Sequence, residues 1–539
     1  MDSNISTTLQ DDGVLIARID MPGRAMNVFS VSMMDSLERL LDHVDATPAV
    51  KGVVITSGKP SFIAGADLEM VRKFTEQART ASHKALHDMC GRLGRLFCRL
   101  ERSGKPYVAA INGLALGGGL EMTLACHERV VADDRRVQLG LPEIKLGLLP
   151  GAGGTQRLPR LIDPLKAMRM LLGGNPVAPA EALEIGLVDE IAPSEGLIEH
   201  ACARARALRC PQAPWNVPGK GFSSAPFDFN REDVFAQIRT LVGVSEYQFA
   251  RYPAYATIMK CVIGGWNRQI EEASRWEMDC FVDLIQNPVA GNMVVTMFLN
   301  RQRAAKEGMA SPALADARVA VSGWIADEVA TLLKAGKAPL VDAAELTEGD
   351  IHLVVAGTDA SSGLRIEWLH DSGSACARAL QEEAGIWLSE ATEHGRCAEI
   401  VASMGGQADA LIDAGRKLAQ WLRAIVLVTR GNAALLPRLE AARDAANVRG
   451  CAEDEVVFAV ALVAARAWEA GEVTNPAFAD VAAVTAGVAP AWSGGPFRQL
   501  GQMTASDVQE RAARLREIDR ALFVLPEHIE TLLQALKES

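Results

Sequence analysis

The sequence predicts an α/β protein, because short apolar runs alternate with helical patterns over its first 195 residues. The same alternation returns from 317 to 431, and residues 432–539 are rich in Ala and Leu and predict helices. A chain of 539 residues exceeds what one compact core usually accommodates, so we expect several domains.

The spacing of apolar residues and the positions of glycines predict the strands and helices of the first part. Apolar runs predict strands at 14–20, 50–58 and 129–133, and apolar residues at helical spacing predict helices at 31–45 and 165–174. PYVAAINGLALGGG (106–119) predicts a strand that runs into a glycine-rich turn, and residues 120–127 predict a helix directly after it.

The composition changes after about residue 210. Residues 211–228 are rich in Pro, Gly and Ser and predict a linker, and helical patterns follow as far as 308. Strands are predicted again at 317–323 and 424–431. We therefore predict four parts: an α/β domain, a helical linker region, a second and shorter α/β domain, and a helical domain, at 1–195, 196–312, 313–430 and 431–539.

Bulk composition narrows the class of protein. Hydrophobic content of 49% and charged content of 23% are typical of a soluble globular chain, and a net charge of -12 argues against nucleic acid as the main partner. The first residues, MDSNISTTLQDDG, lack the features of a signal peptide, and no apolar run of about 18 residues predicts a membrane span. The ten cysteines and nine histidines are dispersed, so we expect no metal site, free thiols and a cytoplasmic location.

A glycine-rich turn before a helix is the first candidate for a reaction site. Residues 117–121 read GGGLE, so Gly118 precedes Glu121 by three positions where the predicted helix begins. Glycine has no Cβ, so a ligand can approach its N–H, and the first amides of a helix lack intrahelical partners. FIAGADLEM (62–70) predicts a similar turn, in which the amide of Ala66 is a second donor. Two such amides directed at one carbonyl oxygen form an oxyanion hole.

Two carboxylates accompany this predicted hole. Glu143 follows Glu121 by 22 residues, within the second glycine-rich stretch GLPEIKLGLLPGAGG (140–154). A pair of carboxylates beside an oxyanion hole suits proton transfer at the carbons next to a thioester carbonyl, with one group as base and the other as acid. Gly151 is predicted to offer a further backbone N–H to a bound water.

These motifs, in this order, resemble the enoyl-CoA hydratase (crotonase) family, and most closely its branch of multifunctional fatty-acid oxidation enzymes. The resemblance covers about residues 1–195 and depends on a few long motifs: MPGRAMNVFS, FIAGADLEM, GGGLEMTLACHERVVADD and LGLPEIKLGLLPGAGGTQRLPRLI. It implies a spiral of repeated β-β-α units. It also implies that Ala66 and Gly118 bind the thioester oxygen, that Glu121 and Glu143 are catalytic, and that Gly151 helps to hold water.

The resemblance further implies hydration of trans-2-enoyl-CoA to 3-hydroxyacyl-CoA, in a β-oxidation type of pathway. A Δ3,Δ2-enoyl-CoA isomerase remains the alternative, because the same carboxylates could move a proton between Cα and Cγ. The CoA part of the substrate is expected to contact two short segments, and the residues concerned are Arg24, Ala25, Asn27, Ala66, Asp67 and Leu68.

The second half departs from the multifunctional enzymes. Their dehydrogenase part has a G-x-G-x-x-G turn that binds NAD, whereas here ARVAV is followed by SGWIADEVATLLKAG, where only Gly323 remains. Asp342, further along the chain from Gly323, is at a position where an acid that binds the ribose could occur. His394 and Glu399 are the nearest match to the family's catalytic dyad, but the family's aromatic-proline motif is missing here. We predict a shortened Rossmann-like domain that has lost NAD binding and dehydrogenase activity, so no cofactor is expected.

Two kinds of partner remain open from the sequence. The second half is a candidate docking surface for a thiolase or another β-oxidation enzyme, as in the multifunctional complexes that the chain resembles. A homo-oligomer is also open, although fusion to a second half argues against the trimer that single crotonase modules form.

Overall fold

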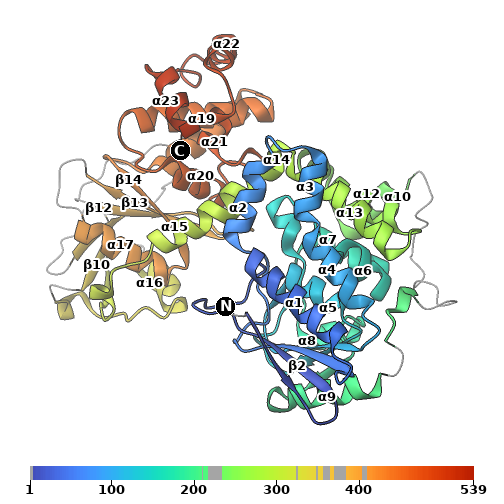
Figure 1. The fold of residues 1–539 in the computed structure, drawn as a ribbon. Coiled ribbons are helices and arrows are strands. Elements are labelled where there is room, and N and C mark those ends of the chain that lie inside the picture. The colour runs from blue at the N-terminus through green and yellow to red at the C-terminus, as the bar shows by residue number, and fades with distance from the viewer. Residues whose placement is uncertain are drawn as a thin grey trace. The chain divides into compact units, whose positions relative to one another are not determined.

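The computed structural model describes two compact units, Met1–Gly291 and Asn292–Ser539 (Figure 1). The described residues are 4–208, 211–216, 233–322, 326–347, 350–355, 364–369, 384–403 and 409–538. The boundary predicted at residue 195 falls inside the first unit, and most of the linker predicted at 211–228 lies outside the described residues, as does Gly323.

Unit 1 is built on a six-stranded sheet with the order β1-β2-β3-β4-β6-β8. Its strands are β1 (Ile5–Leu9), β2 (Val14–Ile19), β3 (Gly52–Ser57), β4 (Tyr107–Ile111), β6 (Glu128–Ala132) and β8 (Glu190–Ala192). Only β1 runs antiparallel to its neighbour, and β3 and β4 are buried along their whole length. Continuous apolar runs such as GVVITS are what a parallel sheet covered on both faces requires.

A small second sheet turns unit 1 into a spiral. Strand β5 (Ala115–Leu116) pairs in parallel with β7 (Leu139–Gly140), and Ile63 bridges Ala115 from the other side. Three consecutive coils of the chain therefore follow one pattern: a strand in the large sheet, a short extended segment in the small sheet, and then a helix. The β-β-α repeat predicted for the first domain is present.

The helices of unit 1 surround the two sheets. They are α1 (Val31–Ala46), α2 (Leu68–Gln77), α3 (His83–Cys90), α4 (Arg92–Glu101), α5 (Gly118–Ala125), η1 (Pro142–Leu146), α6 (Gly154–Leu161), α7 (Pro164–Gly173), α8 (Pro179–Glu184), η2 (Ser194–Gly196), α9 (Leu197–Ala207), η3 (Pro214–Asn216), α10 (Val234–Val242), α11 (Glu246–Arg251), α12 (Pro253–Gly265) and α13 (Ile270–Ile285). In Figure 1, α9 lies on the opposite side of β2 from α1.

Local chemistry explains where these helices begin. Ser30 accepts a hydrogen bond from the amide of Met33 and caps α1, and Asp67 accepts from the amides of Glu69 and Met70 and caps α2. Helices α12 and α13, from the region predicted as a helical linker, contribute Ile258, Cys261 and Leu284 to the same core as the sheet. These two helices are thus part of the packed body of unit 1.

Unit 2 contains the second predicted α/β layer. Its sheet has the order β14-β13-β12-β11-β10-β9, and all neighbours are parallel except β12 and β13. The strands are β9 (Val319–Ser322), β10 (Ile351–Val355), β11 (Leu364–Trp368), β12 (Ala384–Leu388), β13 (Arg396–Ala402) and β14 (Ala424–Arg430). The six strands follow chain order, but the segment at Leu340 bridges Val319 in parallel on the opposite edge of β9 from β10. The order of the chain therefore reverses at β9, as it does at the dinucleotide crevice of doubly wound sheets.

Helices complete unit 2, as predicted for the end of the chain. The first of them continue from α14 (Pro288–Met293) at the unit boundary: η4, a π-helix (Val294–Asn300), α15 (Arg301–Glu307), η5 (Pro312–Leu314), α16 (Ala326–Ala335), η6 (Ala343–Glu345) and α17 (Asp409–Trp421). The last are α18 (Leu435–Val448), α19 (Glu453–Glu469), α20 (Pro476–Thr485), η7 (Ala491–Ser493), α21 (Pro496–Gly501), α22 (Ala505–Leu515) and α23 (Ile529–Glu538). None of the described helices combines the length and apolarity that a membrane crossing would need.

Candidate active site

The register of the small sheet aligns three turns of unit 1. Ile63 pairs with Ala115, and Ala115 pairs with Leu139, so these three residues stand side by side. Ala66 follows Ile63 by three positions, and Gly118 follows Ala115 by three positions. Glu143 follows Leu139 by four positions. The spiral therefore brings together two of the predicted amide donors and one predicted carboxylate from segments far apart in sequence.

The amide of Ala66 is left free by the strand pairing around it. Phe29 donates its N–H to the carbonyl of Gly65 at 2.9 Å and accepts from the amide of Asp67 at 2.8 Å. In a parallel bridge of this kind, the residue between the two bonded neighbours points its own N–H away from the partner strand. Within the described residues the Ala66 amide has no protein acceptor, so it is available to a ligand.

Gly118 starts α5, and its amide also lacks a protein acceptor in the described part of the chain. The preceding Gly117 has φ +53°, and a Cβ there would lie 2.6 Å from Oε1 of Glu143 and 3.8 Å from the Cα of Gly65. Only glycine tolerates both this backbone conformation and this close approach. The two turns are therefore adjacent, and the carboxylate of Glu143 lies against the turn that carries Gly118.

Glu121 lies one turn further along α5 and is 3% exposed. Its Oε1 accepts from the amides of Ala152 at 2.7 Å and Gly154 at 2.8 Å, at the start of α6. Burial raises the pKa of the Glu121 carboxyl, while these two amides and the nearby Arg157 oppose the rise. One oxygen is thus held by the turn, and no described residue bonds the other.

Glu143 differs from Glu121, because the backbone hydrogen bond that supports its carboxyl comes from its own residue. Its Oε2 is enclosed and has no hydrogen-bond partner within the described residues. Burial raises the pKa of the Glu143 carboxyl well above its usual value, and the charge of Glu121 raises it further. Burial and the neighbouring negative charge thus favour the protonated form of Glu143, so this carboxyl is suited to hold a proton.

A third carboxylate, Glu277 of α13, lies at the same turn and is 1% exposed. Its Oε1 accepts from the amide of Gly153 at 2.5 Å, and its Oε2 accepts from the amide of Thr155 at 3.0 Å and from the Thr155 hydroxyl. Four consecutive amides are therefore divided between two carboxylates: residues 152 and 154 bind Glu121, and residues 153 and 155 bind Glu277. Burial, followed by the charge of Glu121, raises the pKa of Glu277 to about 8.

A buried ion pair supports this turn from behind. Arg157 is 0% exposed and donates from Nε to Oε2 of Glu101 at 2.8 Å and from Nη1 to the carbonyl of Ala152 at 3.1 Å. Gly153 has φ +104°, and a Cβ there would lie 1.7 Å from Nη1 of Arg157, so a side chain at this position would displace the guanidinium. The shape of the turn thus depends on glycine and on the arginine together.

Gly151 borders a cavity of about 960 Å³ between α3, α4 and α13. Glu277 and Gly94 border the same cavity, and a Cβ at Gly151 would lie 2.9 Å from the ring of Phe281. The Gly151 amide has no protein acceptor among the described residues, so it remains a candidate donor to water.

The residues predicted to contact CoA do not behave alike. Arg24 and Ala25 lie in an exposed loop, and Nη1 of Arg24 pairs with Oδ2 of Asp67 at 2.5 Å. Asn27, in contrast, is 0% exposed and binds within the core, donating to Ile19, Ser57 and Phe62 and accepting from Met21. Its side chain is therefore not available to a ligand, whereas Arg24 is. The backbone of Leu68 begins α2, and its side chain lies outside what the structure describes.

The two residues of the candidate dyad in unit 2, His394 and Glu399, have separate partners in the structure. Oε1 of Glu399 accepts from the Thr429 hydroxyl and the Leu435 amide, and its Oε2 accepts from the Leu436 amide at the start of α18. His394 lies next to Glu393, with Nε2 3.6 Å from its carboxylate. Asp342 is exposed before η6. Glu399 thus serves as a helix cap, and no group of three metal-ligating side chains occurs in the described part of either unit.

Sequence patterns missed Glu277 and the Glu101–Arg157 pair. A signal for Glu277 was present, because Ile270, Ala273, Glu277 and Leu284 recur at helical spacing, so the carboxylate lies on the apolar stripe of α13. No local signal marks Glu101 and Arg157, which meet across 56 positions.

The raised pKa of Glu277 predicts how stability depends on pH. A carboxyl whose pKa is higher in the folded than in the unfolded state binds more protons when folded, so its contribution is lost as pH rises from about 4.5 towards 8. We expect the unfolding midpoint of the wild type, relative to Glu277→Gln, to fall by several degrees between about pH 5 and pH 9. Thermal melts of both proteins across this range, followed by circular dichroism, test this; parallel curves would contradict it.

The comparison with known proteins agrees with this geometry. Residues 11–214 match the family model described as enoyl-CoA hydratase/isomerase. The curated relatives include the fatty acid oxidation complex subunit alpha of Shewanella frigidimarina, 38% identical over 290 residues, and that of Shewanella amazonensis, 37% identical over 293 residues. Each alignment covers 53% of this chain and 39% or 40% of the relative, so the chain spans about two fifths of these proteins' length.

Solved structures similar to the chain include both activities that the family name contains. An enoyl-CoA hydratase from Bacillus anthracis is 25% identical, with 57% of this chain and 96% of that chain covered and a TM-score of 0.35. A monofunctional enoyl-CoA isomerase from M. smegmatis is 26% identical, with 39% and 86% covered and a TM-score of 0.31.

Proposed function

We propose that unit 1 adds water to trans-2-enoyl-CoA thioesters and forms 3-hydroxyacyl-CoA. The observation that carries this proposal is the enclosed, unpartnered oxygen of Glu143, beside two free amides and in electrostatic contact with Glu121. A buried carboxyl oxygen without a hydrogen-bond partner is costly unless a ligand uses it. The family match of residues 11–214 supports an acyl-CoA substrate.

The geometry supports different roles for the two carboxylates, with Glu121 as base and Glu143 as acid. The amides of Ala66 and Gly118 would bind the thioester oxygen and stabilise the negative charge that develops there. Glu121, whose free oxygen faces no protein donor, would take a proton from water as the oxygen of that water attacks Cβ. Glu143, with its raised pKa, would then give its proton to Cα. Arg24, on the exposed loop, would pair with a CoA phosphate.

The direct test is a panel of substrates given to the purified chain. We expect trans-2-enoyl-CoA thioesters to lose the ultraviolet absorbance of the conjugated thioester as 3-hydroxyacyl-CoA forms, without any added cofactor. A chain inactive on every acyl length and on branched or ring-derived substrates would contradict the proposed function.

Isomerisation is the second candidate, because the family that matches includes both activities. With a 3-enoyl-CoA substrate, proton movement from Cα to Cγ would raise the absorbance of the conjugated thioester, whereas hydration of a 2-enoyl-CoA lowers it. We expect the 2-enoyl-CoA reaction to be the faster of the two, since Glu121 leaves one oxygen free for water. The opposite order would favour the isomerase.

For unit 2 we propose that NAD binding and dehydrogenase activity have been lost. Two observations support this proposal: only Gly323 remains where the multifunctional enzymes have G-x-G-x-x-G, and Glu399 serves as a helix cap. A titration of the chain with NADH, followed by nucleotide fluorescence, is expected to show no saturable binding. Saturation at micromolar concentration would overturn the proposal.

We also propose that unit 2 docks a thiolase, because the relatives are named as subunits of a fatty acid oxidation complex. Co-expression with a thiolase from the same organism is expected to yield a complex that survives gel filtration. Separate elution of the two proteins at micromolar concentration would contradict this role.

A further inference from the structure

The turn at residues 151–155 is held from two sides by carboxylates on different helices. Glu121 on α5 binds the amides of Ala152 and Gly154, and Glu277 on α13 binds those of Gly153 and Thr155. Alternate amides of this turn bind different carboxylates, so neither carboxylate satisfies all four of them. The position of Glu121 is thus coupled to that of Glu277 through one stretch of backbone.

We propose that Glu277 is a positioning residue for hydration, fixing the 151–155 turn so that its opposite amides hold Glu121 in place to activate water. This inference rests on the proposed function. Glu277 does not touch the substrate, since the turn lies between it and Glu121. Its three donors, two amides and the Thr155 hydroxyl, leave it little freedom to rotate.

Position alone does not describe the role of Glu277, because its charge also acts on Glu143. The charges of Glu121 and Glu277 both raise the pKa of Glu143, and the charge of Glu121 also raises the pKa of Glu277. The other titratable groups that face Glu277 come from α6 and α12, and they are Arg157, Arg160 and Cys261. Among these, Arg157 is already paired with Glu101. A negative charge at Glu277 therefore favours the arrangement in which Glu143 keeps its proton.

Glu277→Gln is the informative substitution, because it keeps the shape of the side chain. Whichever way the amide group is turned, its NH2 faces one N–H of the turn, at Gly153 or at Thr155. We expect kcat for a trans-2-enoyl-CoA to fall by about ten- to hundredfold, the usual cost of misplacing a catalytic group by a fraction of an ångström to about one ångström. KM is expected to change less than about threefold, since the amides of Ala66 and Gly118 are untouched.

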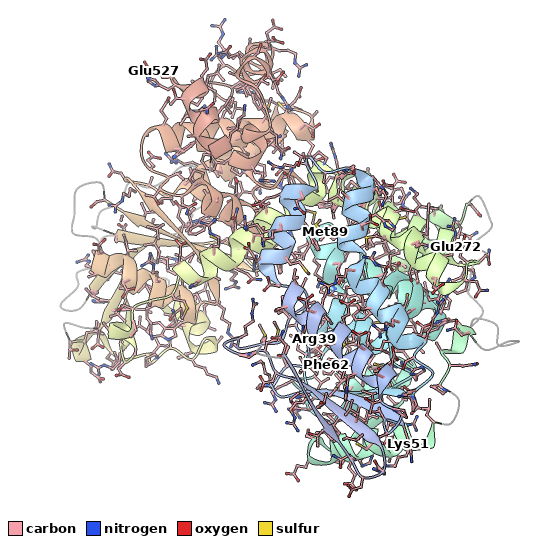
Figure 2. All side chains as sticks on the ribbon, viewed as in Figure 1. Arg39, Lys51, Phe62, Met89, Glu272 and Glu527 are labelled. Carbon is pink, nitrogen blue, oxygen red and sulfur yellow. The ribbon has the colours of Figure 1, made fainter. Side chains whose placement is uncertain are left out.

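The pH profile separates positioning from a general loss of structure. Above about pH 8, where Glu277 is ionised, its replacement by Gln removes a negative charge and lowers the pKa of Glu143, so the basic limb of the kcat/KM profile is expected to move to lower pH in Glu277→Gln. Glu277→Asp keeps the charge and is expected to leave the profile in place. The matched control is Glu272→Gln on the exposed side of the same helix (Figure 2), which is expected to match the wild type in every measurement.

The outcomes distinguish this inference from the proposed function. A wild-type chain without hydratase activity overturns the proposed function and this inference with it. An active wild type with kcat in Glu277→Gln within threefold of normal, or with an unmoved pH profile, overturns only the role of Glu277. Should Glu277→Gln fail to fold, Thr155→Val removes one donor to Glu277 and keeps its charge; a kcat at least threefold lower with KM unchanged supports the role, and an unchanged kcat overturns it.

Discussion

Replacing Glu143 by Gln is expected to lower hydratase turnover at least a hundredfold while the protein stays folded. Gln has the shape of Glu but cannot give a proton to Cα, and positioned acid or base groups contribute typically about 10²–10⁴ in rate. The enclosed Oε2 of Glu143 has no partner within the described residues, so the substitution breaks no described hydrogen bond at that atom.

Glu121→Gln is expected to cause a loss of similar size for a complementary reason. Both amides bind Oε1 of Glu121, and the carbonyl oxygen of Gln can accept from both, so the turn at 152–154 is retained. What is lost is the basic oxygen that removes a proton from water. Steady-state rates with a 2-enoyl-CoA, circular dichroism and the control Glu272→Gln complete the test. Turnover near the wild-type value in either variant would refute the assignment of the pair.

The second large effect is expected from Arg157→Met. Removing one partner of a buried ion pair leaves the other charge without compensation, at a cost of about 3–5 kcal/mol. Glu101 would keep donors from Trp215 and Asn216 but lose the guanidinium, and the carbonyl of Ala152 would lose its partner. The free energy of unfolding, measured by urea titration, is expected to fall by that amount.

A double-variant cycle makes this prediction specific. Glu101→Gln combined with Arg157→Met removes both charges, so the pair is expected to be less destabilised than the sum of the single variants. Arg136→Met, at an ion pair where the arginine side chain is 76% exposed, is the matched control and is expected to cost less than about 1 kcal/mol. Equal losses from Arg136→Met and Arg157→Met would contradict the importance of burial.

Much of the fold and part of the candidate site follow from local sequence. Local apolar spacing and glycines predict three elements: the strand that contains GVVITS, the helix at 31–46 and the turn before Glu121. The structure has all three within a few residues of the predicted positions. Asn27 shows the limit of this reasoning: its loop neighbours are exposed, yet its amide binds four groups of the core. Whether a short polar side chain faces solvent or the interior depends on distant segments that local pattern does not contain.

Glu277 shows the same limit over a longer distance. It meets the amide of Gly153 across 124 positions, from the region predicted as a helical linker, so only the packing of α13 on the first domain reveals the contact. Residues whose partners lie in the same coil of the spiral were predictable, whereas those whose partners come from the later helices were not.

The alignment of Ile63, Ala115 and Leu139 across the small sheet has a consequence for how this catalyst can change. Each of the three loops places one functional group at the same level of the spiral. A substitution at Glu143, four residues after Leu139, would therefore change one reacting group and leave the amides of Ala66 and Gly118 in place. A different reaction on the same thioester would then require substitutions in one segment of the chain only, and the surrounding fold would stay unchanged.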